Sequence, residues 1–199
     1  MIIDPKAIPA GDMYRLMISV IVPRPIAFVS TVGANGTFNV APFSYFNAIT
    51  NEPPLVGIST TRRRGEPKDT LRNIRETGDF VANIVNEPLL QRMVQTSGDW
   101  PEDVSEFELA GLTPAPSVVV RSPRVKECPV SLECRLFQEI PLGEAYFIVG
   151  EIVSVHVDDG VLTDGRVDVE KLKPIGRLGG DGYSVVRDVI HHARPKVPR

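Results

Sequence analysis

The chain has 199 residues, of which 42% are hydrophobic and 24% charged, and its formal net charge is −3. These values predict one globular domain over residues 1–199, with a loosely held tail from about residue 186. The net negative charge gives no reason to expect a nucleic-acid-binding protein, since such proteins carry a strong excess of basic residues. We expect no signal peptide and no membrane span, and therefore a cytoplasmic protein.

The two cysteines, Cys128 and Cys134, fit this expectation. Their spacing matches neither a disulfide framework nor a common zinc site, so free thiols in a reducing compartment are predicted.

Apolar, β-branched and aromatic runs bounded by turn residues predict most of the secondary structure. Such runs predict strands at 26–32, 38–41, 55–60, 80–85, 117–120, 125–128, 130–140 and 146–157. Helical spacing or capping residues predict short helices at 11–17, 68–77, 89–96 and 168–172. Pro42 is expected to end the second strand, and 43–50 to form a loop. Because strands and helices do not alternate, the pattern favours a mainly β barrel or sandwich with attached helices.

Familiar catalytic motifs are missing from the sequence. It contains no nucleophile elbow, no phosphate-binding loop of the nucleotide hydrolases and no zinc-protease motif. His156 lies within a predicted strand, where a structural role is more common than a catalytic one, and His191 with His192 lacks a third metal ligand. We therefore predict no catalytic side chain and no metal site, and expect a bound cofactor to supply any redox chemistry.

One group of polar residues has the chemistry of a phosphate site. Hydroxyls at a strand end and a lysine at a helix start would supply donors and one positive charge to a single phosphate, to which the arginines at 62–64 would add a guanidinium. The candidates are Ser59, Thr60, Thr61, Lys68, Asp69 and Thr70. The alternative is that they are strand-end and capping groups beside a solvated loop.

A second group has the character of a ring-binding edge. Ala41, Pro42, Phe43 and Ser44 would place backbone amides and one hydroxyl along the polar edge of a flat aromatic ligand. The alternative is a proline-terminated strand followed by a loop with an anchoring aromatic residue.

Over residues 12–185 the chain resembles the flavin reductase-like family, the FMN-binding split-barrel proteins that include flavoredoxins. The resemblance is carried by RPIAFVST (24–31), NVAPFSYFN (39–47), STT (59–61), KDTLRNI (68–74) and FVAN (80–83). It implies a six-stranded Greek-key split barrel, a homodimer and FMN near the subunit interface. The implied activity is NAD(P)H-dependent reduction of flavin or a small acceptor by hydride transfer through FMN.

The resemblance also implies roles for particular residues. Residues 41–47, including Ser44 and Asn47, would lie along the isoalloxazine ring, and Ser30 and Thr31 near the ring or ribityl chain. The six candidates above would hold the phosphate. In the segment 177–184 the sequence is closer to flavoredoxins than to reductase components with a C-terminal histidine, and Arg177 and Tyr183 either face the flavin pocket or anchor a glycine-rich tail.

Two other functions remain open at this point. One is a non-catalytic FMN-binding electron carrier that takes electrons from a protein donor. The other is a split-barrel binding module that holds no flavin.

Overall fold

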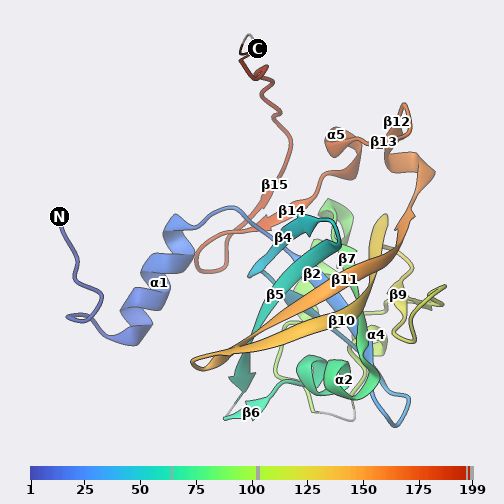
Figure 1. The fold of residues 1–199 in the computed structure, drawn as a ribbon, viewed down its shortest axis with the longest axis horizontal. Helices are drawn as coiled ribbons and strands as arrows, with labels where there is room; N and C mark the ends of the chain where they lie inside the picture. The colour runs from blue at the N-terminus through green and yellow to red at the C-terminus, as the bar shows by residue number, and fades with distance from the viewer. Residues whose placement is uncertain (64, 102–103, 196, 198–199) are drawn as a thin grey trace.

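A curved antiparallel sheet forms the body of the molecule. The computed structural model describes residues 1–63, 65–101, 104–195 and 197 (Figure 1). In spatial order the strands of the sheet are β3 (Phe38–Phe43), β2 (Ala27–Val32), β7 (Asp79–Ile84), β10 (Val130–Leu142), β11 (Ala145–Val157), β5 (Pro54–Arg63) and β4 (Phe46–Asn51), and β6 (Glu66–Pro67) pairs with β5. With eight strands in this sheet, the expected six-stranded arrangement is not confirmed, whereas the mainly β fold is.

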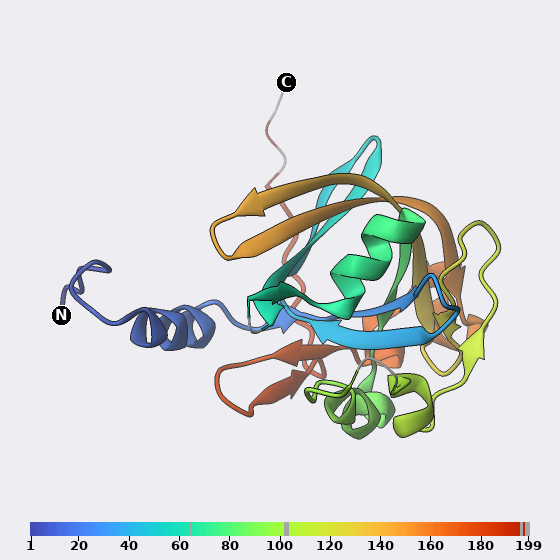
Figure 2. The same ribbon diagram turned by 90° about the horizontal axis from the view of Figure 1, so that it is seen from below.

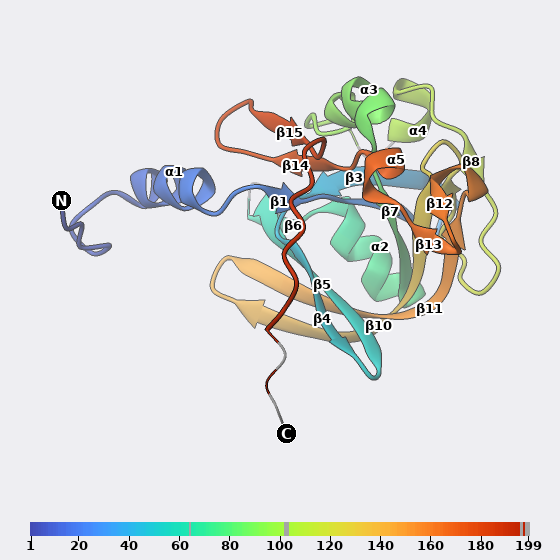
Figure 3. The ribbon, with the colours of Figure 1, turned by 90° about the horizontal axis from the view of Figure 1, so that it is seen from above.

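Helix α2 (Asp69–Thr77) lies within the curve of the sheet, between the β10–β11 hairpin and the β2–β3 hairpin (Figure 2, Figure 3). Its Leu71 and Ile74 are fully buried and pack with residues of β2, β5, β7 and β11 in one core cluster. The helix ends at Gly78, whose φ of 73° is the left-handed conformation that glycine adopts at low cost. Sequence therefore predicted both the helix and its end correctly.

The opposite face of the sheet is covered by short elements. These are the 3-10 helix Glu87–Leu89, α3 (Leu90–Gln95) and α4 (Glu106–Leu109). Phe28 of β2 packs with Met93 and Phe107 in a second core cluster, while its neighbours Ala27 and Val29 face the α2 side. Since successive side chains of a strand point to opposite faces, β2 is buried on both sides.

Smaller elements complete the chain. Three short strands, β1 (Arg24–Pro25), β14 (Ile175–Arg177) and β15 (Tyr183–Val185), form a separate antiparallel sheet. The others are α1 (Ala10–Val20), β8 (Pro114–Ala115), β9 (Arg124–Val125), the 3-10 helix Asp159–Val161, β12 (Leu162–Thr163), β13 (Arg166–Val167) and α5 (Val169–Leu172). Helix α1 projects away from the body in all three views (Figure 1, Figure 2, Figure 3), and none of its residues is buried.

Two predictions around β3 are wrong. Pro42 does not end the strand but pairs with Phe28, because β3 is an edge strand and an edge tolerates a residue without N–H. The predicted loop 43–50 contains β4, which pairs with β5. Apart from Phe46 the residues of β4 are exposed, so the segment lacks the apolar run by which strands were recognised.

Two predicted strands in the second half are also corrected. Residues 117–120 form a bend rather than a strand, and their valines are largely exposed, Val118 at 77% and Val119 at 41%. The backbone N–H groups of Val118, Val119 and Val120 donate to the buried carboxylate of Glu133 instead of to a neighbouring strand. Of the predicted strand 125–128 only Val125 lies in a strand, the two-residue β9, which pairs with β8.

Cys128 and Cys134 are free, as predicted, and both are buried. Burial raises the pKa of the Cys134 thiol to about 12, so this thiol stays protonated and unreactive at neutral pH. Within the described residues no helix is long and apolar enough to cross a membrane.

Candidate functional site

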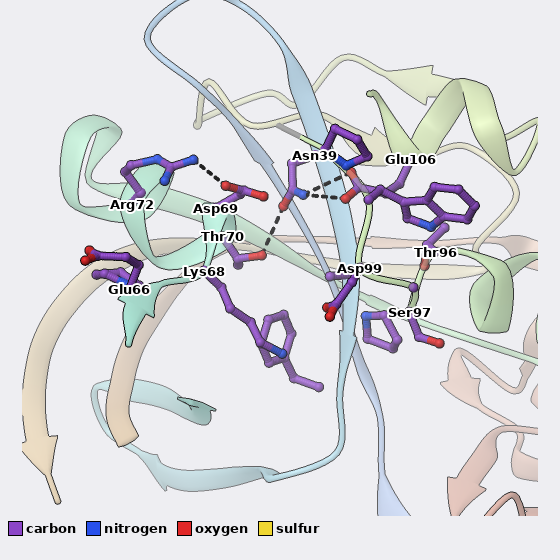
Figure 4. A pocket seen from close by; sticks show the side chains of 17 residues that line it. Asn39, Glu66, Lys68, Asp69, Thr70, Arg72, Thr96, Ser97, Asp99 and Glu106 are labelled. Carbon is purple, nitrogen blue, oxygen red and sulfur yellow. Dashed lines mark hydrogen bonds and ion pairs between the residues drawn. The ribbon is translucent and has the colours of Figure 1, made fainter. Parts of the chain in front are cut away.

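A cleft of about 400 Å³ opens between the edge strand β3, the start of α2 and the loop that follows α3 (Figure 4). Its lining residues come from segments more than sixty residues apart in the sequence: Asn39, Ala41, Pro42, Phe43, Glu66, Pro67, Lys68, Asp69, Thr70, Arg72, the loop 96–101 and Glu106. Both sets of residues that the sequence analysis singled out therefore contribute to one cleft. The proposed ring-binding edge contributes Ala41, Pro42 and Phe43, and the proposed phosphate site contributes Lys68, Asp69 and Thr70.

Lys68 lies where these two groups meet. It is the residue that immediately precedes α2, and its Nζ lies 5.8 Å from the centroid of the Phe43 ring. A lysine ammonium over an aromatic face is held in place by cation–π attraction without losing its charge. The cleft thus has one wall of apolar strand residues and, next to it, a positive group at the start of a helix.

The first turn of α2 has the donor set of an anion site. The backbone N–H groups in the first turn of an α-helix have no partner within the helix, and in α2 no side chain among the described residues caps them. Asp69 is paired with Arg72 one turn further on, which reduces the negative charge that faces the cleft (Figure 4). Oriented N–H groups, the helix dipole and a lysine together fit a phosphate monoester. These residues therefore fit the phosphate end of FMN.

Ser30 and Thr31 lie behind this cleft rather than in it. Both are fully buried on β2. The Ser30 hydroxyl donates to the Pro123 carbonyl at 2.5 Å, and Thr31 Oγ1 donates to Asn39 Oδ1 at 3.3 Å. Thr31 thus contacts a residue of the cleft wall, whereas the hydroxyl of Ser30 is used inside the core.

Ser44 and Asn47 lie beyond the end of the cleft wall. Ser44 Oγ accepts a hydrogen bond of 3.3 Å from Arg24 Nε. The buried Arg24 guanidinium also donates to the carbonyls of Ile18, Ile21 and Leu178, and so connects this corner to the end of α1 and to the β14–β15 hairpin. Asn47 is exposed on β4.

The phosphate candidates on β5 are separated from those on α2. Thr60 is buried and its hydroxyl donates to the Thr61 carbonyl, while Ser59 is half-buried and does not line the cleft. Thr61 lines a different hollow together with Arg62 and Glu144. Arg64 lies outside the described residues. The structure therefore brings only Lys68, Asp69 and Thr70 of the six candidates into the cleft.

Arg177 and Tyr183 do not line the cleft. The Arg177 guanidinium lies 4.5 Å from the centroid of the Tyr183 ring across the β14–β15 pair, and its Nη1 donates to the Gly182 carbonyl. This arrangement fits the alternative in which the two residues anchor the glycine-rich tail.

Asn39, Glu106 and the loop 96–101 line the cleft although no sequence motif predicts a role for them there. Asn39 lay within the run 39–47 that carried the resemblance, but its side chain was not given a role. Glu106 follows a segment with no periodic signal, and it reaches the cleft only because α4 packs against β3. Burial outweighs hydrogen bonds from Val40 and Asn39 and raises the pKa of Glu106, with the nearby Asp69 acting in the same direction.

Comparison with known proteins defines the family. Residues 19–171 match the model of the "Flavin reductase like domain". The chain belongs to this family, and its cofactor class is therefore a flavin.

Solved structures agree with this assignment. Nitrilotriacetate monooxygenase component B from Bacillus cereus superposes with a TM-score of 0.94 at 39% identity, covering 96% of this chain and 98% of that one. The 2-nitrobenzoate 2-nitroreductase NbaA of Pseudomonas fluorescens gives 0.91 at 32% identity, covering 100% and 99%. Flavoredoxin of Desulfovibrio vulgaris gives 0.78 at 26% identity, covering 86% and 91%. The similarity confirms the mainly β split-barrel fold.

Proposed function

We propose that this chain is an oxidoreductase that binds FMN in the cleft between β3 and α2 and uses NAD(P)H to reduce flavin or a small acceptor. The observation that carries the proposal is the uncapped start of α2 with Lys68 beside it, next to the apolar wall of Ala41, Pro42 and Phe43. Membership of the flavin reductase-like family supports a flavin as the ligand.

The residues of the cleft would bind and orient the cofactor. The first-turn N–H groups of α2 and the Lys68 ammonium would hold the phosphate, and β3 would form the wall along the ring. Ser44, held by Arg24, would lie at the corner where β3 gives way to β4. The chemistry that FMN supplies when bound is hydride acceptance from a nicotinamide and delivery of the electrons to an acceptor.

Overall, NAD(P)H loses a hydride, and the acceptor gains two electrons and two protons, one of them from water. The protein's contribution is to bind and position the reactants, which agrees with a sequence that lacks an acid–base constellation. Two observations support two classes of acceptor: membership of the flavin reductase-like family supports a flavin, and the name of one similar protein, a 2-nitrobenzoate 2-nitroreductase, supports a nitroaromatic compound. We include both a second flavin and a small nitroaromatic compound in the proposal.

We also propose that the protein is a homodimer. An isolated helix of eleven residues is marginally stable in water, and helices in proteins depend on packing of an apolar face. In a single chain α1 has no buried residue, although Met13, Leu16 and Met17 follow helical spacing on one side of it. A second copy would cover this face, and sedimentation equilibrium should then give twice the mass of the chain.

Anaerobic titration of the FMN-loaded protein with NADH and with NADPH tests the proposed activity. We expect the flavin absorbance at about 450 nm to disappear with roughly one equivalent of at least one of the two nucleotides. A protein that binds FMN but is reduced by neither nucleotide would instead be an electron carrier served by a protein donor. A protein that binds no flavin would be a binding module.

A further inference from the structure

A buried carboxyl group borders the cleft on the side away from Lys68. Glu106 of α4 is 7% exposed, and it lines both the main cleft and a smaller adjoining one of about 230 Å³. Its Oε1 and Oε2 accept hydrogen bonds of 3.0 and 2.9 Å from Asn39 Nδ2 (Figure 4). Its Oε2 accepts a third from the Val40 backbone N–H at 3.3 Å. A group so placed is shielded from water but close to any ligand in the cleft.

These contacts connect Glu106 to the first turn of α2. Because the Asn39 amide nitrogen faces the carboxyl, its Oδ1 faces Thr70, whose hydroxyl donates to it at 3.0 Å. A threonine hydroxyl has one hydrogen, so Thr70 gives it to Asn39 and not to a ligand in the cleft. An anion at the start of α2 would therefore be held by backbone N–H groups and Lys68, and it would face a hydrogen-bonded chain that ends at Glu106.

Burial and the carboxylate of Asp69 disfavour the ionised form of Glu106. Among the described residues, the charged groups that line these two clefts together with Glu106 are Glu66, Lys68, Asp69, Arg72, Glu76 and Asp99. Burial, followed by the effect of Asp69, raises the pKa of Glu106 against the hydrogen bonds that it accepts. A phosphate monoester carries up to two further negative charges, and a like charge nearby favours the protonated form of a carboxyl group.

We propose that binding of a phosphate monoester at the start of α2 is coupled to protonation of Glu106, so that FMN affinity depends on pH through this residue. The inference rests on the proposed function, because FMN is the ligand that carries the phosphate. Glu106 is in this account a positioning residue that acts through Asn39 on α2, and its proton removes a negative charge from the cleft as the anion enters.

Calorimetry of FMN binding in two buffers with different ionisation enthalpies counts the protons taken up. At a pH about one to two units above the second phosphate pKa of about 6, the ligand's own ionisation contributes little. We expect the wild-type chain to take up a measurable fraction of a proton with FMN and none with riboflavin. Glu106→Gln keeps the size and one acceptor oxygen of the side chain but cannot be protonated, so its uptake with FMN should vanish.

The pH dependence of affinity provides a second readout. FMN binding to the wild type should weaken as the pH rises, by at most about tenfold per pH unit, and should be nearly flat in Glu106→Gln. Glu108→Gln, an exposed change on the same helix, is the matched control and should behave as the wild type. Equal proton uptake by the wild type and Glu106→Gln would overturn the inference but leave the proposed function intact. Failure of every variant to bind FMN would overturn the proposed function.

A measurement without ligand keeps the inference testable if glutamine disturbs the cleft. A carboxyl group whose pKa is raised by folding stabilises the protein below its unfolded pKa, and this contribution is lost as the pH rises through the folded pKa. The wild type should therefore lose thermal stability relative to Glu106→Gln as the pH rises above the ordinary glutamate pKa of about 4.3. Parallel stability curves for the two proteins would contradict the assignment of a protonatable Glu106.

Discussion

Lys68→Ala is expected to weaken FMN binding by roughly 10- to 100-fold, which corresponds to the loss of one charge-assisted hydrogen bond to the phosphate. The Lys68 ammonium lies beside the Phe43 ring at the start of α2, where the proposed phosphate site is. Riboflavin lacks the phosphate, so its affinity should change by less than about threefold. Titrations of protein intrinsic fluorescence with the two ligands measure both effects.

Lys126→Ala provides the matched control, because Lys126 is exposed and does not line the cleft. It should leave both affinities unchanged. Thr70→Ala should have a smaller effect on FMN than Lys68→Ala, since the Thr70 hydroxyl donates to Asn39. Equal losses of FMN and riboflavin in Lys68→Ala would place the phosphate away from α2.

Glu133→Ala is expected to lower the free energy of unfolding by about 3–5 kcal/mol. Glu133 of β10 is fully buried, and its carboxylate accepts hydrogen bonds from the backbone N–H groups of Val118, Val119 and Val120. His156 Nε2 lies 2.5 Å from its Oε1. Removing the carboxylate leaves three partly buried donors without this partner and releases the bend that they hold. Urea unfolding at neutral pH measures the loss.

Glu139→Ala on the same strand is the control for this variant. Glu139 pairs with Arg75 at the surface, where an ion pair contributes about 0–1 kcal/mol.

Although burial raises it, hydrogen bonds from Val118 and His156, and then from Val119 and Val120, keep the pKa of Glu133 below its usual value. Its contribution is therefore present at neutral pH and is lost as the pH falls through the folded pKa, so the difference between wild type and Glu133→Ala should shrink in acid. A cost no larger than that of Glu139→Ala would contradict this role.

Local sequence signals predicted the parts of the fold that depend on apolar patterning. The strands in 26–32, 55–60 and 80–85 and the helix that ends at Gly78 all bury continuous or periodic apolar residues. The sequence does not predict strand β4, because its residues are mostly exposed and it is stabilised by pairing with β5 rather than by burial of apolar side chains. The valines at 118–120 have the composition of a strand but do not form one. Their backbone N–H groups donate to the carboxylate of Glu133 instead of to a neighbouring strand.

The candidate site was predictable only where its residues are close in sequence. Lys68, Asp69 and Thr70 lie at a helix start whose signals are local, and Ala41, Pro42 and Phe43 lie on the strand that faces it. Glu106 and the loop 96–101 reach the cleft because α3 and α4 pack in the second core cluster. Local sequence patterns do not predict this tertiary packing. Likewise, the sequence predicts the hydroxyls of Ser30 and Thr60 as ligand donors, but in the fold they donate hydrogen bonds to backbone carbonyls.

A crystal structure of the chain with FMN would show directly where the cofactor and its phosphate bind. We expect the phosphate at the first turn of α2, within hydrogen-bond distance of its backbone N–H groups and of Lys68 Nζ, with the ring along Ala41, Pro42 and Phe43. FMN bound elsewhere, for example with its phosphate in the hollow beside Thr61 and Arg62, would contradict the claim.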